Sequence, residues 1–242
     1  MEGFILAAGL GTRLRPVTND KPKALVEVGG ITLLERAIRR LEEAGIVHIV
    51  VNVHHFADKV IDFIECHQWQ AKIDISDERV LLLNTGGGLK HAAPYFSGRE
   101  NILIHNVDIL SDIDLRDVER HHVAAGNLAT LCVSQRETDR PLEFSPDGLL
   151  LGRSNIIPDK EQSSNPRYVA FSGVSVVSPE LLALLPEADQ PYSIVDEYIR
   201  LSHKGRRIGY YLHAGTKEHW LDVGKQKTLE QAKHLWTASS AK

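Results

Sequence analysis

The stretch FILAAGLGTR, residues 4–13, is the starting point for interpreting this chain. Its first three residues form a short apolar run, which is typical of a buried β-strand. Two alanines and two glycines follow, so little side-chain bulk lies at the carboxyl end of this strand, and Gly9 and Gly11 can adopt torsion angles closed to other residues. Four cations come next: Arg13, Arg15, Lys21 and Lys23. Because backbone N–H groups and fixed cations together bind phosphate oxygens, the stretch predicts a polyphosphate site.

Two common phosphate-binding loops do not fit this stretch. The Walker pattern requires lysine and then serine or threonine after its second glycine, whereas Gly11 precedes Thr12 and Arg13. The dinucleotide fingerprint requires a third glycine where this chain has Leu14, which argues against an NAD site. The structural alternative is a glycine-rich turn with incidental basic residues.

Length and composition fit one large α/β domain or two small ones. The chain has 242 residues, of which 43% are hydrophobic, so it can bury a sizeable core. The net charge of -4 argues against nucleic acid as the main partner. Cys66 and Cys132 have no metal-ligand spacing and are expected to be reduced thiols of a cytoplasmic protein. No signal peptide is recognisable and no apolar run is long enough to span a membrane, so no membrane partner is expected.

The order of the apolar patterns predicts a parallel sheet covered by helices. A capping box at Thr32 and Glu35 opens a predicted helix that ends at Gly45. A nearly continuous apolar run over residues 46–53 predicts a strand buried on both faces, and a second helix is expected over 57–66. Alternating strands and helices are typical of β-α-β units.

The next part of the chain predicts shorter elements. Residues 79–83 are a candidate extended segment, and residues 84–88 are expected to form a glycine-rich turn. A helix is expected over 114–124, with Ser111 or Asp112 available to cap it.

From Pro141 onward, short extended runs predict an antiparallel lobe that covers the end of the parallel sheet. Residues 1–236 are therefore expected to form a single α/β domain, and 237–242 a frayed tail.

A further predicted strand, over residues 101–105, is followed closely by Asp108. Ligands of open α/β sheets bind at the carboxyl ends of the strands, so Asp108 and the loop at 9–13 should face one crevice. A carboxylate beside bound phosphates is a suitable ligand for Mg²⁺. The alternative is a turn or helix-capping aspartate.

The string LAAGLGTR at 6–13, followed by Pro22-Lys23, resembles the signature of the sugar-1-phosphate nucleotidyltransferase family. The similarity extends over nearly the whole chain and is greatest to small bacterial members that use N-acetylmuramate, mannose or heptose 1-phosphate. It implies an α/β fold with a three-layer, Rossmann-like, mostly parallel mixed sheet and a small antiparallel substrate-binding lobe, which is the GT-A-like nucleotidyltransferase fold. It also implies that a nucleoside triphosphate and a sugar 1-phosphate give a nucleoside-diphosphate sugar and pyrophosphate, with Mg²⁺ as cofactor.

The resemblance also implies roles for the matched residues. Asp222, within WLDVG at 220–224, is the expected second metal ligand beside Asp108. Arg13 and Lys23 are the expected catalytic cations, Arg13 at the β- and γ-phosphates and Lys23 at the α-phosphate and the sugar phosphate. The residues expected to bind the nucleotide are Ala7, Ala8, Gly9, Gly11, Thr12, Arg13, Asn84, Thr85, Gly86 and Asn106. Those expected to bind the sugar are Glu143, Arg153 and Gly173.

Three positions depart from the family pattern. Val107 stands where glycine commonly precedes the metal aspartate. Asn84 holds a place often taken by glycine, glutamate or glutamine, which leaves UTP, GTP and CTP open, with a slight preference for UTP from the turn at 86–88. A Glu-Lys-Pro segment that gives larger relatives a second phosphate lysine is not recognisable, and Arg153 is the substitute candidate.

The expected chemistry follows from charge. An oxygen of a sugar 1-phosphate is already an anion, so its attack on the α-phosphorus needs no general base, and positioning with electrostatics must supply the rate. Two other classes remain open. One is a glycosyltransferase that uses a nucleotide-sugar donor, for which Asp112 and Asp114 form a candidate Asp-x-Asp metal motif, although this motif is expected to cap the next helix. The other is a non-catalytic nucleotide-sugar sensor. The sugar and the oligomeric state also remain open.

Adjacent histidines occur at His54-His55 and His121-His122. Neither pair has the spacing of metal ligands, so these side chains are expected in surface or capping roles.

Overall fold

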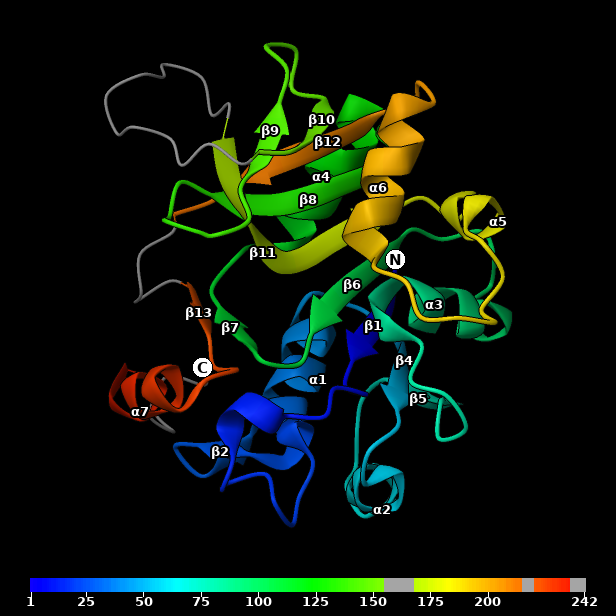
Figure 1. The fold of residues 1–242 in the computed structure, drawn as a ribbon. Helices are drawn as coiled ribbons and strands as arrows, with labels where there is room; N and C mark the ends of the chain where they lie inside the picture. The colour runs from blue at the N-terminus through cyan, green and yellow to red at the C-terminus, as the bar shows by residue number, and fades with distance from the viewer. Residues whose placement is uncertain (155–167, 215–219, 236–242) are drawn as a thin grey trace.

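Strand β1 (Glu2–Leu6) lies in the parallel part of a nine-stranded sheet in the computed structural model, which describes residues 1–154, 168–214 and 220–235 (Figure 1). The strands run in the order β10-β9-β11-β6-β1-β4-β5, and β8 and β12 continue the sheet beside β11. Strand β1 pairs in parallel with β4 and β6, and β4 in parallel with β5. The other bounds are β4 (His48–Val53), β5 (Lys72–Asp77), β6 (Ile102–Asn106), β8 (Ala129–Ser134), β9 (Leu142–Phe144), β10 (Leu150–Arg153), β11 (Tyr168–Val177) and β12 (Ile208–Leu212).

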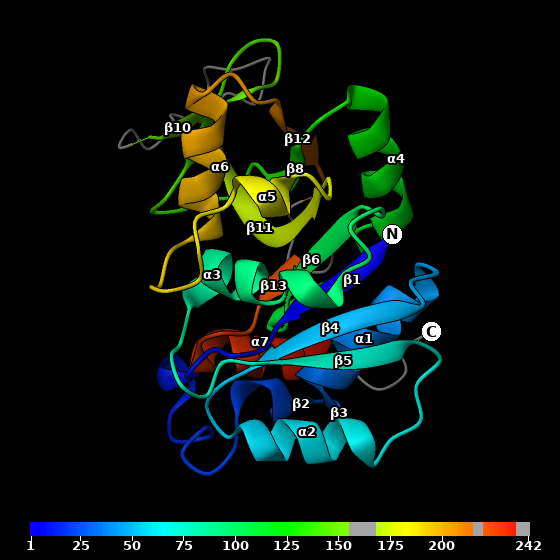
Figure 2. The same ribbon diagram turned by 90° about the vertical axis from the view of Figure 1, so that its right-hand side faces the viewer.

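Helices cover both faces of the sheet and form two apolar cores. Figure 2 shows α2 on one side of β4 and β5, and α3 on the other. Ile5 packs into the first core and its neighbour Phe4 into the second, as alternation along a strand requires. The first core includes side chains of α1 (Leu33–Glu43), α2 (Ala57–Glu65), α4 (Leu115–Ala125) and α7 (Gln226–Leu235). The second includes those of α3 (Asn84–His91), α5 (Leu181–Leu184) and α6 (Ile194–His203).

The antiparallel lobe is part of the same sheet. Strand β11 runs antiparallel to β6 and β8, and β9 pairs antiparallel with β10 and β11. The register of β11 against β8 shifts between Phe171 and Ser175, and Gly173 has a φ of 75° that favours glycine. The expected α/β fold with a mixed, mostly parallel sheet and an antiparallel lobe is confirmed, while the expected tail at 237–242 lies outside the described residues.

Local signals predicted both ends of α1 correctly. The Thr32 hydroxyl accepts a hydrogen bond from the backbone N–H of Glu35 (3.1 Å), as the capping box predicts, and Gly45 follows α1 with a φ of 83°. The cap of α4 was predicted wrongly, because the carboxylate of Asp114, rather than Ser111 or Asp112, accepts from the first turn of that helix.

Two predictions around residue 84 are also wrong. Residues 79–83 form no strand, since β5 ends at Asp77. Residues 84–88 are not a turn but the first part of helix α3.

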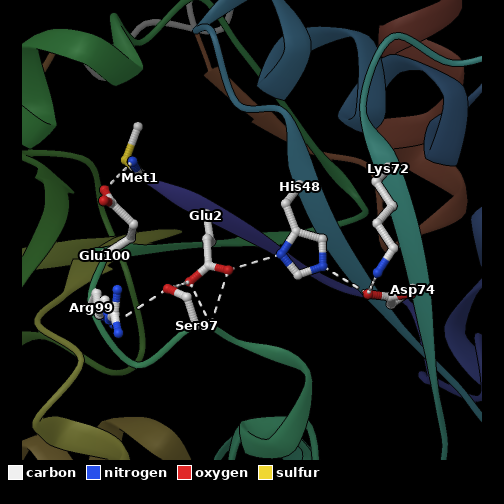
Figure 3. A network of polar contacts seen from close by, with 8 residues as sticks. All are labelled: Met1, Glu2, His48, Lys72, Asp74, Ser97, Arg99 and Glu100. Carbon is white, nitrogen blue, oxygen red and sulfur yellow. Dashed lines mark hydrogen bonds and ion pairs between the residues drawn. The ribbon is translucent and has the colours of Figure 1, made fainter.

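The amino ends of β1, β4 and β5 are joined by a polar network (Figure 3). One ring nitrogen of His48 faces Glu2 Oε1 and the other faces Asp74 Oδ2, each at 2.8 Å. Glu2 also accepts hydrogen bonds from the N–H and hydroxyl of Ser97. We call Glu2, His48, Asp74 and Ser97 the amino-end network. This network lies at the edge of the sheet where β1, β4 and β5 begin.

In the ranges that the structure describes, no helix combines the length and the apolar character needed to cross a membrane.

Candidate active site

A cleft of about 660 Å³ lies at the carboxyl ends of β1, β4 and β6. The register pairs Leu6 with Asn52 on one side and with Asn106 on the other, which brings all three residues to one level. The lining residues are Leu6, Ala8, Gly9, Leu10, Gly11, Thr12, Arg13, Lys23, Asn52, Leu82, Asn84, Thr85, Asn106, Asp108, Pro191, Asp222 and Gly224. Most residues expected at the nucleotide, both expected catalytic cations and both expected metal ligands therefore line one cavity.

The loop after β1 curls around its two glycines. Gly11 is left-handed (φ 65°) and caps a 3₁₀ turn at Thr12–Leu14. The Thr18 hydroxyl donates to the carbonyl of Gly11 (2.8 Å), which fixes the curl. A Cβ on Gly9 would lie 3.6 Å from Lys23 Nζ, so the Lys23 amine sits directly over the loop. Lys23 therefore lies within van der Waals reach of the loop at the cleft.

The N–H groups of Ala7 and Ala8 are already used within the protein. Both donate to Asn52 Oδ1, at 2.7 and 3.2 Å. The backbone N–H groups left for a ligand in this loop are therefore those that follow Ala8. Ala8 lines the cleft, whereas Ala7 does not.

Asp108 and Asp222 converge although they are far apart in sequence. Strand β7 (Ile109–Ser111) pairs antiparallel with β13 (Trp220–Asp222), and the N–H of Val223 donates to the carbonyl of Asp108 (2.9 Å). A Cβ on Gly224 would lie 2.8 Å from Asp222 Oδ1, 2.9 Å from Asp108 Oδ2 and 2.7 Å from an Arg13 Nη atom. Two carboxylates and one guanidinium therefore surround the space that glycine leaves open.

The electrostatics of this cluster reflect its crowding. Lys23 Nζ donates to Asp108 Oδ2 at 2.8 Å, and both side chains are largely buried. Burial raises the pKa of Asp222, and the nearby charge of Asp108 raises it further, while the N–H of Gly224, Arg13 and Lys23 oppose the rise. Two like charges in one buried place favour a cation between them.

The donor set fits a hard divalent cation. Mg²⁺ takes oxygen ligands, commonly one or two carboxylates, and completes its shell with phosphate oxygens and water. Asp108 and Asp222 supply such a pair beside Arg13 and Lys23, and no group of three or more acidic, histidine or cysteine side chains suited to a metal occurs within the described residues.

The start of α3 forms the opposite wall. Asn84 and Thr85 line the cleft, and Asn84 is left-handed (φ 61°), which asparagine tolerates better than most residues. Gly86 instead faces Tyr192, because a Cβ there would lie 2.5 Å from the ring, and its N–H donates to the carbonyl of Tyr192. The Thr85 hydroxyl accepts from the N–H of Ile194 (2.9 Å).

The three expected sugar residues do not share one position. Gly173 adjoins the cleft, since a Cβ there would lie 3.0 Å from Asn106 Nδ2. Glu143 lies on β9 and Arg153 on β10, and neither lines the cleft. Arg153 pairs with Asp196 of α6 at 2.9 Å.

Three polar residues at or near the cleft were missed by the motif-based interpretation. Asn52 and Glu78 are buried and bonded to each other, and Asn52 interrupts the apolar strand β4. Arg136 stacks on the ring of Trp220, with its guanidinium carbon 4.1 Å from the ring centre. The only sequence signal for Asn52 is a lone amide in an apolar run, while Glu78 and Arg136 lie in ordinary polar segments.

The predicted surface role holds for His121, which is exposed. His54 is partly buried and hydrogen-bonds to the backbone carbonyl of Glu78. The expected surface or capping role is wrong for His122, which is buried between the hydroxyls of Thr130 and Ser178. The Asp-x-Asp motif provides the cap of α4 through Asp114.

Comparisons with known proteins show the family to which the chain belongs. The N-acetylmuramate alpha-1-phosphate uridylyltransferase of Caulobacter vibrioides is 36% identical over 91% of this chain and 90% of that protein. The protein of the same name from Neisseria meningitidis is 30% identical over 97% and 98%. A mannose-1-phosphate guanyltransferase of Pichia angusta is 26% identical and matches the whole chain over 66% of its own length.

Solved structures show the same fold. HddC of Yersinia pseudotuberculosis superposes with a TM-score of 0.77 at 21% identity, covering 96% of this chain and 98% of that one. The model of the family described as nucleotidyl transferase matches residues 2–239. With this match over nearly the whole length and two relatives at 30% identity or more, the chain belongs to the nucleotidyl transferase family and is a nucleotidyltransferase.

Proposed function

We propose that this nucleotidyltransferase acts on a sugar 1-phosphate, transferring a nucleoside monophosphate from a nucleoside triphosphate and releasing pyrophosphate. N-acetylmuramate 1-phosphate and UTP are the favoured pair, because the two relatives of that name match almost end to end. The observation that carries the proposal is the convergence of Asp108, Asp222, Arg13 and Lys23 beside the loop after β1.

The reaction needs two anions to meet. A phosphate oxygen of the sugar 1-phosphate attacks the α-phosphorus, a new P–O bond forms, and the bond to the β-phosphate bridging oxygen breaks as pyrophosphate leaves with its electron pair. No proton has to be removed from the nucleophile, so the site must position both substrates and offset their charge. We assign Arg13 and the N–H groups of Gly9 to Thr12 to the β- and γ-phosphates, and Lys23 to the α-phosphate and incoming sugar phosphate.

Asp108 and Asp222 are the residues that would hold Mg²⁺. When bound there, the ion supplies charge stabilisation at the phosphate oxygens. The Lys23 ammonium, held by Asp108 at 2.8 Å, keeps a second positive charge at the same place. Removing Asp108 would therefore disturb both the metal site and Lys23, whereas removing Asp222 would disturb the metal site.

We assign the base and the sugar to opposite ends of the cleft. Asn84 and Thr85 line it at the start of α3, which suits the base, and Asn106 with Gly173 leads toward the sugar. Glu143 and Arg153 stay candidates for the outer sugar contacts. Cys66 and Cys132 are both free thiols, which supports a cytoplasmic location.

A substrate matrix tests the proposal. UTP, GTP, CTP and ATP are each combined with N-acetylmuramate, mannose, heptose and glucose 1-phosphates plus Mg²⁺, and released pyrophosphate is measured. We expect turnover with UTP and N-acetylmuramate 1-phosphate to exceed every other pair. Tight nucleotide binding with no pyrophosphate from any pair would favour the sensor, and sugar transfer from a nucleotide sugar to an acceptor would favour the glycosyltransferase.

A further inference from the structure

A buried amide-carboxylate pair connects the two walls of the cleft. Asn52, at the carboxyl end of β4, is 1% exposed, and Glu78, directly after β5, is 2% exposed. Asn52 Nδ2 donates to Glu78 Oε1 at 2.7 Å. Neither residue belongs to a phosphate, metal or base contact assigned above.

Each polar side-chain atom of this pair has a defined partner. Asn52 Oδ1 accepts from the N–H groups of Ala7 and Ala8, where the loop after β1 begins. Glu78 Oε2 accepts from the N–H of Leu83, which immediately precedes α3 (3.2 Å). The hydrogen bonds therefore run without a break from one wall of the cleft to the other.

The packing leaves the pair little freedom. A Cβ on Gly88 of α3 would lie 2.6 Å from Glu78 Oε1 and 2.9 Å from Asn52 Nδ2. The third glycine of the run at 86–88 thus lets α3 pack directly on the pair. Glu78 is also tied at its backbone, where its N–H donates to Val53 and its carbonyl is bonded to His54.

We propose that Asn52 and Glu78 form a brace that sets the spacing between the phosphate-binding loop and the base-binding end of α3. They act as positioning residues, because neither has to touch the reacting atoms. The inference rests on the proposed function for the names of the substrates, but the brace itself concerns nucleotide binding. We assign the nucleoside triphosphate to both walls and the sugar 1-phosphate to the end of the cleft near Asn106 and Gly173. Loss of the brace should therefore weaken nucleotide binding selectively.

The polarity of the brace allows a test by exchange. Asn52→Asp places two carboxylates in contact, and Glu78→Gln puts an amide opposite an amide, so each single variant leaves a buried group mismatched. In the double variant Asn52→Asp/Glu78→Gln the two groups exchange roles. The carboxylate now at position 52 accepts from Ala7, Ala8 and the new amide, and the oxygen of that amide accepts from Leu83.

The expected effects separate the two substrates. Each single variant should raise the Kd and KM for the triphosphate about tenfold or more, with the KM for the sugar 1-phosphate within about twofold. The double variant should return the triphosphate values to within about threefold of the unmodified protein.

Asn127→Asp is the matched control. Asn127 is also buried and donates through its side chain, to Thr130, but it does not line the cleft. This change should lower the melting temperature without altering either substrate constant.

Nucleotide Kd is measured by calorimetry with UTP and Mg²⁺, so this result does not depend on turnover. Flat pyrophosphate release by the unmodified protein would reject the proposed function while the calorimetric comparison still decides on the brace. The brace is rejected if the single variants bind UTP normally, if they weaken both substrates equally, or if the double variant is no better than the worse single one.

Discussion

At the scale of single residues, Arg136 is the strongest addition to the site. Trp220 and Asp222 are two positions apart on β13, so their side chains share a face, and Arg136 stacks on Trp220. One Nη atom donates to the carbonyl of Phe171 (2.7 Å), while its Nε is buried and has no partner among the residues described. Burial lowers the pKa of Arg136, and the Asp222 carboxylate opposes that effect. Arg136 is therefore a fixed cation on the Asp222 side of β13.

Arg136 should matter for the sugar phosphate more than Arg153 does. Arg136 lies near the Asp222 carboxylate, which lines the cleft, whereas Arg153 is engaged by Asp196. Arg136→Met keeps an unbranched side chain against Trp220 but removes the charge. We expect the KM for the sugar 1-phosphate to rise about tenfold to a hundredfold, with the triphosphate KM nearly unchanged.

Arg153→Met is the matched comparison for initial-rate kinetics with each substrate varied in turn. A larger effect at Arg153 than at Arg136, or an equal change in both KM values for Arg136→Met, would contradict the assignment.

The residue scale also shows where sequence interpretation succeeds. The rule that parallel strands end at a common edge predicts Asp108 beside the loop at 9–13, and the resemblance of WLDVG to a family motif adds Asp222. Asn52, Glu78 and Arg136 belong to no motif, and their partners come from distant elements. Only the folded structure shows which of these distant side chains are in contact.

At the scale of elements, the amino-end network joins three strands where no ligand is proposed. Both ring nitrogens of His48 face carboxylate oxygens, so both can donate only when the ring is protonated. Burial alone would raise the pKa of Glu2, but the hydrogen bonds from His48 and Ser97 lower it overall. The pKa of Asp74 is also lowered, since Lys72 and His48 outweigh the effect of burial. The network therefore holds two carboxylates in their charged form.

Replacing His48 should destabilise the fold without altering substrate binding. His48→Leu leaves the carboxylates of Glu2 and Asp74 without their shared donor, so we expect a loss of about 1–3 kcal/mol in the free energy of unfolding at pH 7. Because both carboxylates have lowered pKa values in the folded state, this difference should shrink as the pH falls and they become protonated. Urea unfolding measures the loss, with the exposed His67→Leu as control. Equal stability of the two variants would show that the network contributes nothing.

The packing of α3 explains why the turn predicted at residues 84–88 is wrong. Glycine disfavours helix, so a run of three predicts a turn. In the structure, Gly86 faces the Tyr192 ring and Gly88 faces Glu78, and neither place has room for a side chain. Close packing of α3 thus outweighs the local preference. By contrast, α1 and β4 were predictable because capping and apolar period agree there with the tertiary structure.

At the scale of the whole molecule, the sheet is one continuous platform with an apolar core on each face. The last described segment packs against earlier parts of the chain. Strand β13 pairs with β7, and α7 packs into the same core as Val28 of the N-terminal part (Figure 1). Asp222 reaches the cleft because β13 pairs with β7. The parallel order of the first strands could be predicted from the alternation of strands and helices, whereas the pairing of β13 with β7 joins segments far apart in the sequence.

The same burial that builds the two cores should make the protein sensitive to acid. Burial, with a smaller contribution from the charge of His121, lowers the pKa of His122 to about 4, whereas an unfolded histidine titrates near 6.5. Below pH 6.5 the unfolded chain therefore binds a proton that the folded chain does not, so stability falls as the pH drops from 6.5 toward 4. The limiting slope is about 1.4 kcal/mol per pH unit for one proton.

His122→Gln tests this sensitivity, because glutamine can bond to Thr130 and Ser178 but does not titrate. Free energies of unfolding at pH 7.5, 6.0 and 5.0 should fall less steeply for His122→Gln than for the unmodified protein. The exposed neighbour gives the matched control, His121→Gln, which should keep most of the slope. Burial also lowers the pKa of His105 to about 4, so the unfolded chain binds a second proton there. His105 is present in both variants, so His122→Gln should reduce the pH dependence by at most the contribution of one proton. If the free energy of unfolding changed with pH equally for His122→Gln and the unmodified protein, His122 would take up its proton equally in the folded and unfolded states, which would contradict this prediction.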